Sequence, residues 1–300
     1  MHFSHIAARA FDRPLLLEPR RGMTILATLA QLIARSNVES RLDTPRPSRL
    51  AMDDAGDAPE RFASLPFGLT HWERDKAFPQ VGKVAVIEAD GTMVNKNGSL
   101  GPSCGMTGYD SIRTQIMAAL RDDEIDAMAL LVETPGGEVA GCFDLADFIH
   151  EAQAVKPIWA IVDGMAASAG YALASSCTRI TCSSVGLLGS IGVIVAHWNF
   201  AKMLADDGLD VSLIYSGKHK ADGNPFEPLP AEVRAEIQGE IDSVWDLFAS
   251  LVARGRGLTP AAVKALEAQT YLAPAALKLK LCDAVQSPSD ALVELLESVS

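Results

Sequence analysis

Short apolar runs alternate with amphipathic segments from about residue 82 onward. KVAVIEADG (residues 83–91), DAMALLVE (126–133) and PIWAIVDG (157–164) have the length and composition of strands, the last two of them buried. Residues 108–122 and 138–153 have apolar positions at helical spacing, which predicts helices between these strands. Strands that alternate with helices indicate βαβ units. The expected fold class is therefore α/β with a mostly parallel sheet.

The alternation continues through the second half of the chain. A short helix is expected from Ser168, then a strand over TRITCS (178–183), an apolar segment SIGVIVA (190–196), a helix from Asn199 and a strand over DVSLIYS (210–216). Residues 230–255 form a long amphipathic pattern with proline at its start, which predicts a long helix near the C-terminal end.

The first part of the chain has a different composition. Residues 1–50 contain eight arginines and no lysine, and residues 40–66 are rich in Pro, Asp, Arg and Ser without an apolar period. We therefore predict an N-terminal arm and linker, partly mobile, over residues 1–66 and one domain over residues 67–300. The arginines indicate either a solvated tail or an arm that docks on an acidic partner.

Charge and cysteine content narrow the function classes. The formal net charge of −12 argues against general binding of nucleic acid or anionic membranes. Five cysteines are an odd number, which fits a reducing compartment better than secretion. No apolar run reaches the roughly 18 residues of a membrane span, and RRGMTILATLAQLIA (20–34) lacks the cleavage site of a signal peptide. The expected location is the cytoplasm.

Two features at strand ends suggest acyl chemistry. Pro135, Gly136 and Gly137 follow one buried strand and precede a helix; such a turn is either an ordinary tight loop or a site where backbone N–H groups receive a developing negative charge. Ser168 lies at the next strand-to-helix junction, in the wholly uncharged stretch GMAASAGYALASS. A serine there is often a helix cap, but small neighbours would let a peptide reach its hydroxyl. Because position 166 is alanine, the G-x-S-x-G elbow of α/β-hydrolases is missing.

A nucleophilic serine needs a base. None of the six histidines has the spacing of a familiar catalytic triad. His150 lacks the second histidine that a zinc motif requires, and His197 is expected to be a core histidine because its segment is apolar. Lys218 and Lys220 follow a predicted strand in SGKHKADGNPF (216–226). Taken alone, two lysines in a turn indicate a solvated loop.

Together these motifs resemble the serine peptidases of the signal peptide peptidase A family, in the ClpP/crotonase superfamily. The resemblance runs from about Lys83 to Val285 and is greatest to the phage branch of head maturation (capsid assembly) proteases. TPGGEVAGCFDLAD, GSIGVIVAHWN and LIYSGKHKADGNP carry it, and HIAARAFDRPLLLEP near the N-terminus adds to it.

The resemblance implies a ClpP/crotonase-like fold, with a repeated ββα/βαβ core and long C-terminal helices, and a Ser-Lys dyad. Ser168 matches the nucleophile and Lys220 the general base, while Gly137 and Ala169 match the backbone donors of the oxyanion hole. The histidine base of the ClpP branch would fall near position 193, which is valine here. A lysine base must be neutral, which costs a free lysine about 4.6 kcal/mol at pH 7, so the site is expected to be dry. No cofactor or metal is implied.

The implied partners are scaffold, portal and capsid proteins, with self-cleavage as a further option, and a homo-oligomeric ring whose neighbouring subunit could complete the site. Neither nucleic acid nor a membrane is expected as a partner. The phage branch can carry a scaffold segment after the peptidase domain. Here we expect either that the scaffold is a separate protein or that the chain is truncated. Alternatives are a cellular peptidase that degrades signal peptides, an acyl-CoA enzyme of the crotonase fold and an inactive scaffold; Ser168 with Lys220 argues against the last two.

Overall fold

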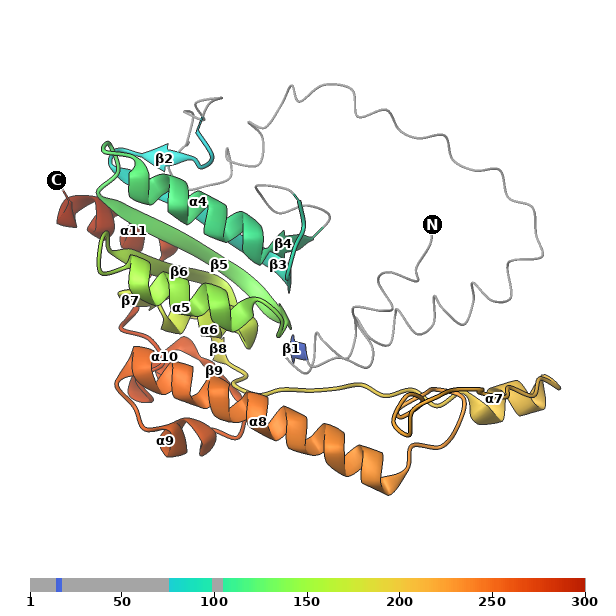
Figure 1. Cartoon of the computed structure of the whole chain (residues 1–300). Helices are drawn as coiled ribbons and strands as arrows, with labels where there is room; N and C mark the ends of the chain where they lie inside the picture. Colours follow the sequence, from blue (N-terminus) through green and yellow to red (C-terminus); the bar gives the residue numbers. More distant parts are fainter. Residues whose placement is uncertain (1–14, 18–75, 99–104, 300) are drawn as a thin grey trace.

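A ten-stranded sheet organises residues 15–17, 76–98 and 105–299, the part of the chain that the computed structural model describes (Figure 1). Its main path has the order β10-β7-β6-β5-β3-β2, in which the neighbours from β10 to β3 are parallel and β2 is antiparallel to β3. The strands are β1 (Leu15–Leu17), β2 (Gln80–Val81), β3 (Val84–Val94), β4 (Met106–Gly108), β5 (Ala127–Glu138), β6 (Ile158–Ala167), β7 (Arg179–Cys182), β8 (Leu187–Gly189), β9 (Thr270–Leu272) and β10 (Ala284–Val285). The predicted α/β class with a mostly parallel sheet is confirmed.

Helices cover both faces of this sheet, which explains why its central strands are continuous apolar runs. The larger core lies under α4, α5 and α6 and includes Ile112, Leu145, Tyr171 and Phe248. A smaller cluster lies under α11, where Leu292 and Leu295 pack on Trp159 of β6. The helices are α4 (Tyr109–Arg121), α5 (Cys142–Ala152), α6 (Ala169–Ser175), α7 (Ala201–Asp206), α8 (Ala231–Arg256), α9 (Pro260–Lys264), α10 (Ala273–Lys278) and α11 (Pro288–Ser298).

The carboxyl ends of the central strands shift out of the regular ladder. The β3–β5 register shifts between Asp90 and Thr92, and the β5–β6 register shifts between Val132 and Thr134. Such bulges bend a strand and re-aim its side chains. Beyond the shifts, the strand ends pair with short strands: β4 on β3, β1 on β5, β8 on β6 and β9 on β8. This end of the sheet holds the candidate site.

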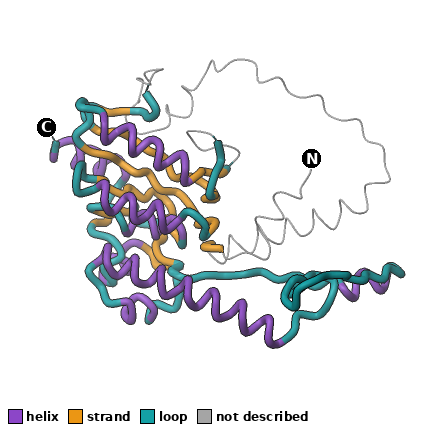
Figure 2. The backbone as a smooth tube through the Cα atoms, in the orientation of Figure 1, coloured by secondary structure: helices purple, strands orange, loops and turns teal. Residues whose placement is uncertain are grey.

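One part of the chain projects from the packed layers, as Figure 2 shows. It consists of residues 192–232, in which no residue is buried, and the first half of α8. The second half of α8 packs against α5 and α6 through a buried set that includes Phe248 and Val252. We call residues 192–232 the projecting segment.

Most of the predicted elements are present, with three corrections. The strand expected over residues 210–216 has no strand conformation, because it has no neighbouring strand to pair with. Residues 135–138 extend β5 instead of forming a turn before the next helix, which begins only at Cys142. His197 lies, partly exposed, in the projecting segment and not in the core.

Most of the predicted N-terminal arm (1–66) lies outside the described residues. Its described part, Leu15–Leu17, forms β1 and pairs with β5. Among the helices of the described residues, none combines the length and the hydropathy that a membrane crossing requires.

Candidate active site

Ser168 has an unusual backbone conformation between β6 and α6. Its φ is 54° and its ψ is −116°, a backbone conformation that residues other than glycine rarely adopt. Two hydrogen bonds hold it there: the Ser168 N–H donates to the Gly189 carbonyl (2.8 Å), and the Ala172 N–H donates to the Ser168 carbonyl (2.9 Å). Such a residue costs about 1–3 kcal/mol and occurs most often at functional sites.

The hydroxyl of Ser168 is also in an unfavourable position. The residue is fully buried, and its Oγ has no hydrogen-bond partner among the described residues. A buried hydroxyl left without a partner costs about 1–3 kcal/mol. Ser168 thus combines backbone strain with an unsatisfied hydroxyl, a combination that is more typical of a catalytic residue than of a structural one.

The end of β5 lies directly beside this serine. A Cβ on Gly136, whose φ is +111°, would overlap the carbonyl oxygen of Leu16 and lie 2.9 Å from the Cβ of Ser168. A Cβ on Gly137 would overlap the backbone of Met93. Both glycines are therefore required by close backbone approach. Thr134 fixes this segment: its hydroxyl donates to the Gly91 carbonyl (2.5 Å) and accepts from the Gly136 N–H (3.0 Å).

The start of α6 packs on the same strand end. A Cβ on Gly170 would overlap the Thr134 methyl group, so the first turn of α6 rests on β5. The first N–H groups of a helix have no partner within it, and Ala169 provides the first of them here. Ser168, Gly137 and Ala169 are thus brought to one place. The oxyanion role of Gly137 and Ala169 stays a prediction.

One buried thiol in contact with this centre, that of Cys142, is unreactive. Cys142 is buried and donates through its Sγ to the Ala169 carbonyl (3.8 Å). The pKa of Cys142 is raised to about 12, mainly by burial; a hydrogen bond with Tyr109 lowers it and the charge of Asp144 raises it. Only a thiolate is a good nucleophile, so Ser168 is the better candidate.

Lys220 is not brought to Ser168 within one chain. It lies exposed in a turn of the projecting segment, where its N–H donates to the Gly217 carbonyl (3.1 Å). The connection from α7 to α8, which contains this turn, lies in the outer part of the projection in Figure 1, between α7 and the start of α8 and away from α6. Lys218 is exposed in the same turn.

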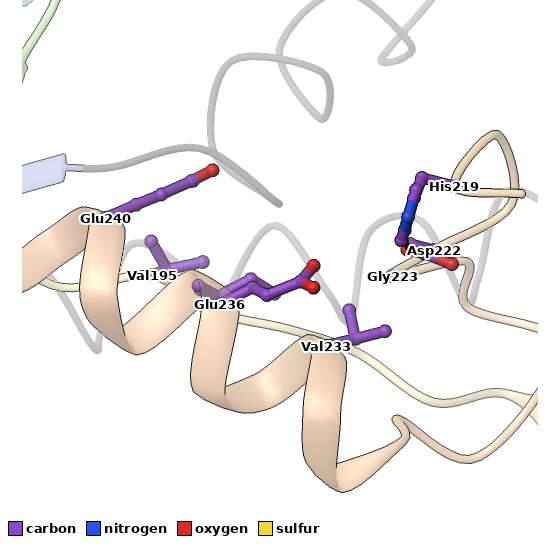
Figure 3. Close-up of a pocket in the computed structure, with 8 residues that line it drawn as sticks. Val195, His219, Asp222, Gly223, Val233, Glu236 and Glu240 are labelled. Carbon is purple, nitrogen blue, oxygen red and sulfur yellow. Dashed lines mark hydrogen bonds and ion pairs between the residues drawn. The ribbon is translucent and has the colours of Figure 1, made fainter.

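The residues around Lys220 face the first turns of α8 across a pocket of about 300 Å³ (Figure 3). His219 Nδ1 and Asp222 Oδ2 are 2.7 Å apart, and Glu236 of α8 offers a further oxygen. One ligand atom of each of these three exposed residues lies within 4.8 Å of the others, a set of donor atoms that could hold a divalent cation. Sequence reasoning missed this group because Glu236 belongs to a different element.

Sequence reasoning also missed β1 as a neighbour of the site. The signal available was the apolar PLLLEP run, which carried part of the family resemblance but gave no position in the fold. In the structure, β1 lies along residues 136–138.

Comparison with known proteins gives two family matches. The model of peptidase family S49 matches residues 150–300, and the Clp protease model matches residues 96–184. Together they include Ser168, Gly137 and Lys220.

Two curated relatives come from phages. The chain is 37% identical, over 97% of its length, to the head-tail preconnector protein GP5 of Enterobacteria phage P21, and 34% identical, over 98%, to the capsid assembly protease C of Escherichia phage lambda. It spans only 56% and 66% of these two proteins. A putative signal peptide peptidase SppA of Enterococcus faecium is 27% identical over 71% of the chain and 62% of its own length.

Proposed function

This chain belongs to peptidase family S49, and from that premise we propose that it is a serine endopeptidase with Ser168 as nucleophile and Lys220 as general base. The observation that carries the proposal is the strained, buried and unpartnered Ser168 beside the extended Gly136-Gly137 backbone. A structural serine at a helix start would adopt an ordinary cap conformation and use its hydroxyl as a hydrogen-bond acceptor.

The proposed reaction is amide hydrolysis in two steps. The neutral amine of Lys220 takes the proton of Ser168 while Oγ attacks the scissile carbonyl carbon, and the N–H groups of Gly137 and Ala169 receive the oxyanion. The C–N bond then breaks, and the leaving amine takes the proton from Lys220. In the second step Lys220 takes a proton from water, which attacks the ester carbonyl. The ester C–O bond breaks, Lys220 returns the proton to the Ser168 Oγ, and the new carboxylic acid is released.

The base comes from a neighbouring subunit in this proposal. In one chain Lys220 lies on a projecting segment without a buried residue, and that segment exposes large apolar side chains, among them Leu209, Ile214 and Tyr215. Ile214 is 99% exposed, and several exposed apolar side chains on one segment favour a contact with another chain. Contacts between different surfaces of identical subunits build rings when the rotation closes. Docking of the segment on the next subunit would bury Lys220 next to that subunit's Ser168 and favour its neutral form.

The biological role that we propose is phage capsid maturation. One of the two phage relatives is named a capsid assembly protease. The proposed substrates are the scaffold and portal proteins, with self-cleavage as a further reaction, inside the assembling prohead in the host cytoplasm.

The test is co-expression with the scaffold, portal and capsid proteins proposed as substrates, with the products read by intact mass. The wild type is compared with Ser168→Ala, Lys220→Ala and, as the matched control, His197→Ala. Cleavage should disappear in the first two variants and persist in the third. Identical products from the wild type and Ser168→Ala would refute the peptidase proposal.

A further inference from the structure

Strand β1 has partners on both sides. On one side it runs antiparallel to β5, with Leu15, Leu16 and Leu17 opposite Glu138, Gly137 and Gly136. On the other side the Leu15 N–H donates to the Ile194 carbonyl (2.8 Å), and the Ile194 N–H donates to the Leu15 carbonyl (3.0 Å). Residues 15–17 thus lie between the glycine-rich end of β5 and the start of the projecting segment, a strand position that we call the groove.

This groove lies beside the nucleophile. The Leu16 carbonyl and the Ser168 side chain are both close to Gly136, since a Cβ on that glycine would meet both. Leu16 is also opposite Gly137, the proposed oxyanion donor. The backbone of Leu16 therefore borders the place where a scissile peptide must lie for Ser168 to attack it.

Extended peptides bind proteins by adding a strand to an exposed edge, with backbone hydrogen bonds for affinity and side-chain pockets for specificity. Residues 136–138 form such an edge beside Ser168, and β1 pairs with it on one side and with Ile194 on the other. We propose that β1 is an intramolecular occupant of the peptide-binding groove and competes there with substrate strands. This inference rests on the proposed peptidase function.

The side chains of β1 indicate what the groove accepts. Leu16 is fully buried in the main core and Leu15 is 4% exposed. The groove therefore favours extended peptides with a leucine-like residue opposite Gly137. A tethered ligand has an effective concentration in the millimolar range, so a weak substrate would be excluded until β1 leaves.

The test measures groove binding separately from catalysis. A fluorescent peptide with the sequence RPLLLEP, residues 13–19 of this chain, is titrated by anisotropy into Ser168→Ala protein with either the native β1 or Leu16→Asp. A carboxylate at this fully buried position should expel β1, and the peptide should then bind about tenfold more tightly. Leu277→Asp is the matched control, because Leu277 is 40% exposed in α10 and should leave binding unchanged.

The outcomes separate the two proposals. Equal peptide affinity with and without Leu16→Asp would overturn the inference. If Leu16→Asp fails to fold, Leu16→Ala provides the same comparison, with a smaller gain expected. In the Ser168-intact protein, release of β1 should raise kcat/KM for a short peptide by about tenfold. If the groove is freed but no variant hydrolyses peptide, the peptidase proposal fails while the occupied groove stands.

Discussion

Replacement of Ser168 by alanine should stabilise the fold while it abolishes hydrolysis. The alanine removes a buried hydroxyl that has no hydrogen-bond partner among the described residues, and this removal should raise the free energy of unfolding by about 1–3 kcal/mol. For a chain of this size that gain raises Tm by about 2–6 °C. Ser168→Gly should also relieve the strain of the positive φ, about 1–3 kcal/mol, against a loss of about 0.5–1 kcal/mol from the greater freedom of unfolded glycine.

If Lys220 reaches Ser168 of a neighbouring subunit, it should reduce the stabilisation that Ser168→Ala gives. A lysine paired with the hydroxyl satisfies it, so Ser168→Ala should stabilise more in a Lys220→Ala background than with Lys220 present. The expected coupling is about 0.5–3 kcal/mol, as for residues in direct contact.

The assay is urea unfolding of the four proteins of this double-mutant cycle at one fixed protein concentration, because stability linked to assembly depends on concentration. Peptide hydrolysis is measured on the same samples. If Ser168→Ala destabilised the protein by more than about 1 kcal/mol in both backgrounds, Ser168 would be a structural cap and the reasoning would be refuted.

Three further outcomes are expected. Burial would raise the pKa of Asp283, but hydrogen bonds from Arg256 and from the Ile180 N–H hold this pKa below its ordinary value. The resulting stabilisation of the fold is present above about pH 4 and is lost as the pH falls through the folded pKa. Asp283→Asn should therefore cost about 1 kcal/mol at pH 7 and reduce the acid dependence of the free energy of unfolding, measured as a function of pH. Iodoacetamide at pH 8 should leave hydrolysis intact and Cys142 unlabelled by intact mass, since burial raises the pKa of that thiol to about 12; rapid labelling of native protein would contradict this. Chelation by EDTA should not reduce hydrolysis, because the proposed steps use side chains and backbone N–H groups only; a loss restored by a divalent cation would instead implicate His219, Asp222 and Glu236.

The local sequence pattern was sufficient to predict the central strands and the position of Ser168 between a strand and a helix. The runs that become β5 and β6 are apolar because helices cover both faces of the sheet, and the small residues around Ser168 indicate a close backbone approach. The apolar strands and the small residues around Ser168 can be recognised from residues adjacent in the sequence, so a local pattern is enough to predict them.

Contacts between segments far apart in the sequence could not be predicted from local patterns. Leu16 lies more than a hundred residues from Gly137 in sequence, and no local feature of PLLLEP announces their pairing. The extended form of residues 135–138 depends on β1 and β3, so the glycines alone suggested a turn. Residues 210–216 have the composition of a strand but no strand beside them in one chain.

Complementation between two inactive variants tests the central claim most directly. Ser168→Ala and Lys220→Ala proteins are purified separately, mixed under conditions that exchange subunits, and assayed for peptide hydrolysis. If Lys220 acts on the neighbouring subunit, about a quarter of the interfaces in a randomly mixed assembly pair an intact Ser168 with an intact Lys220, and activity should return to that extent. If exchanged mixtures stay as inactive as either variant alone, the dyad does not form between subunits and this account of the site is wrong.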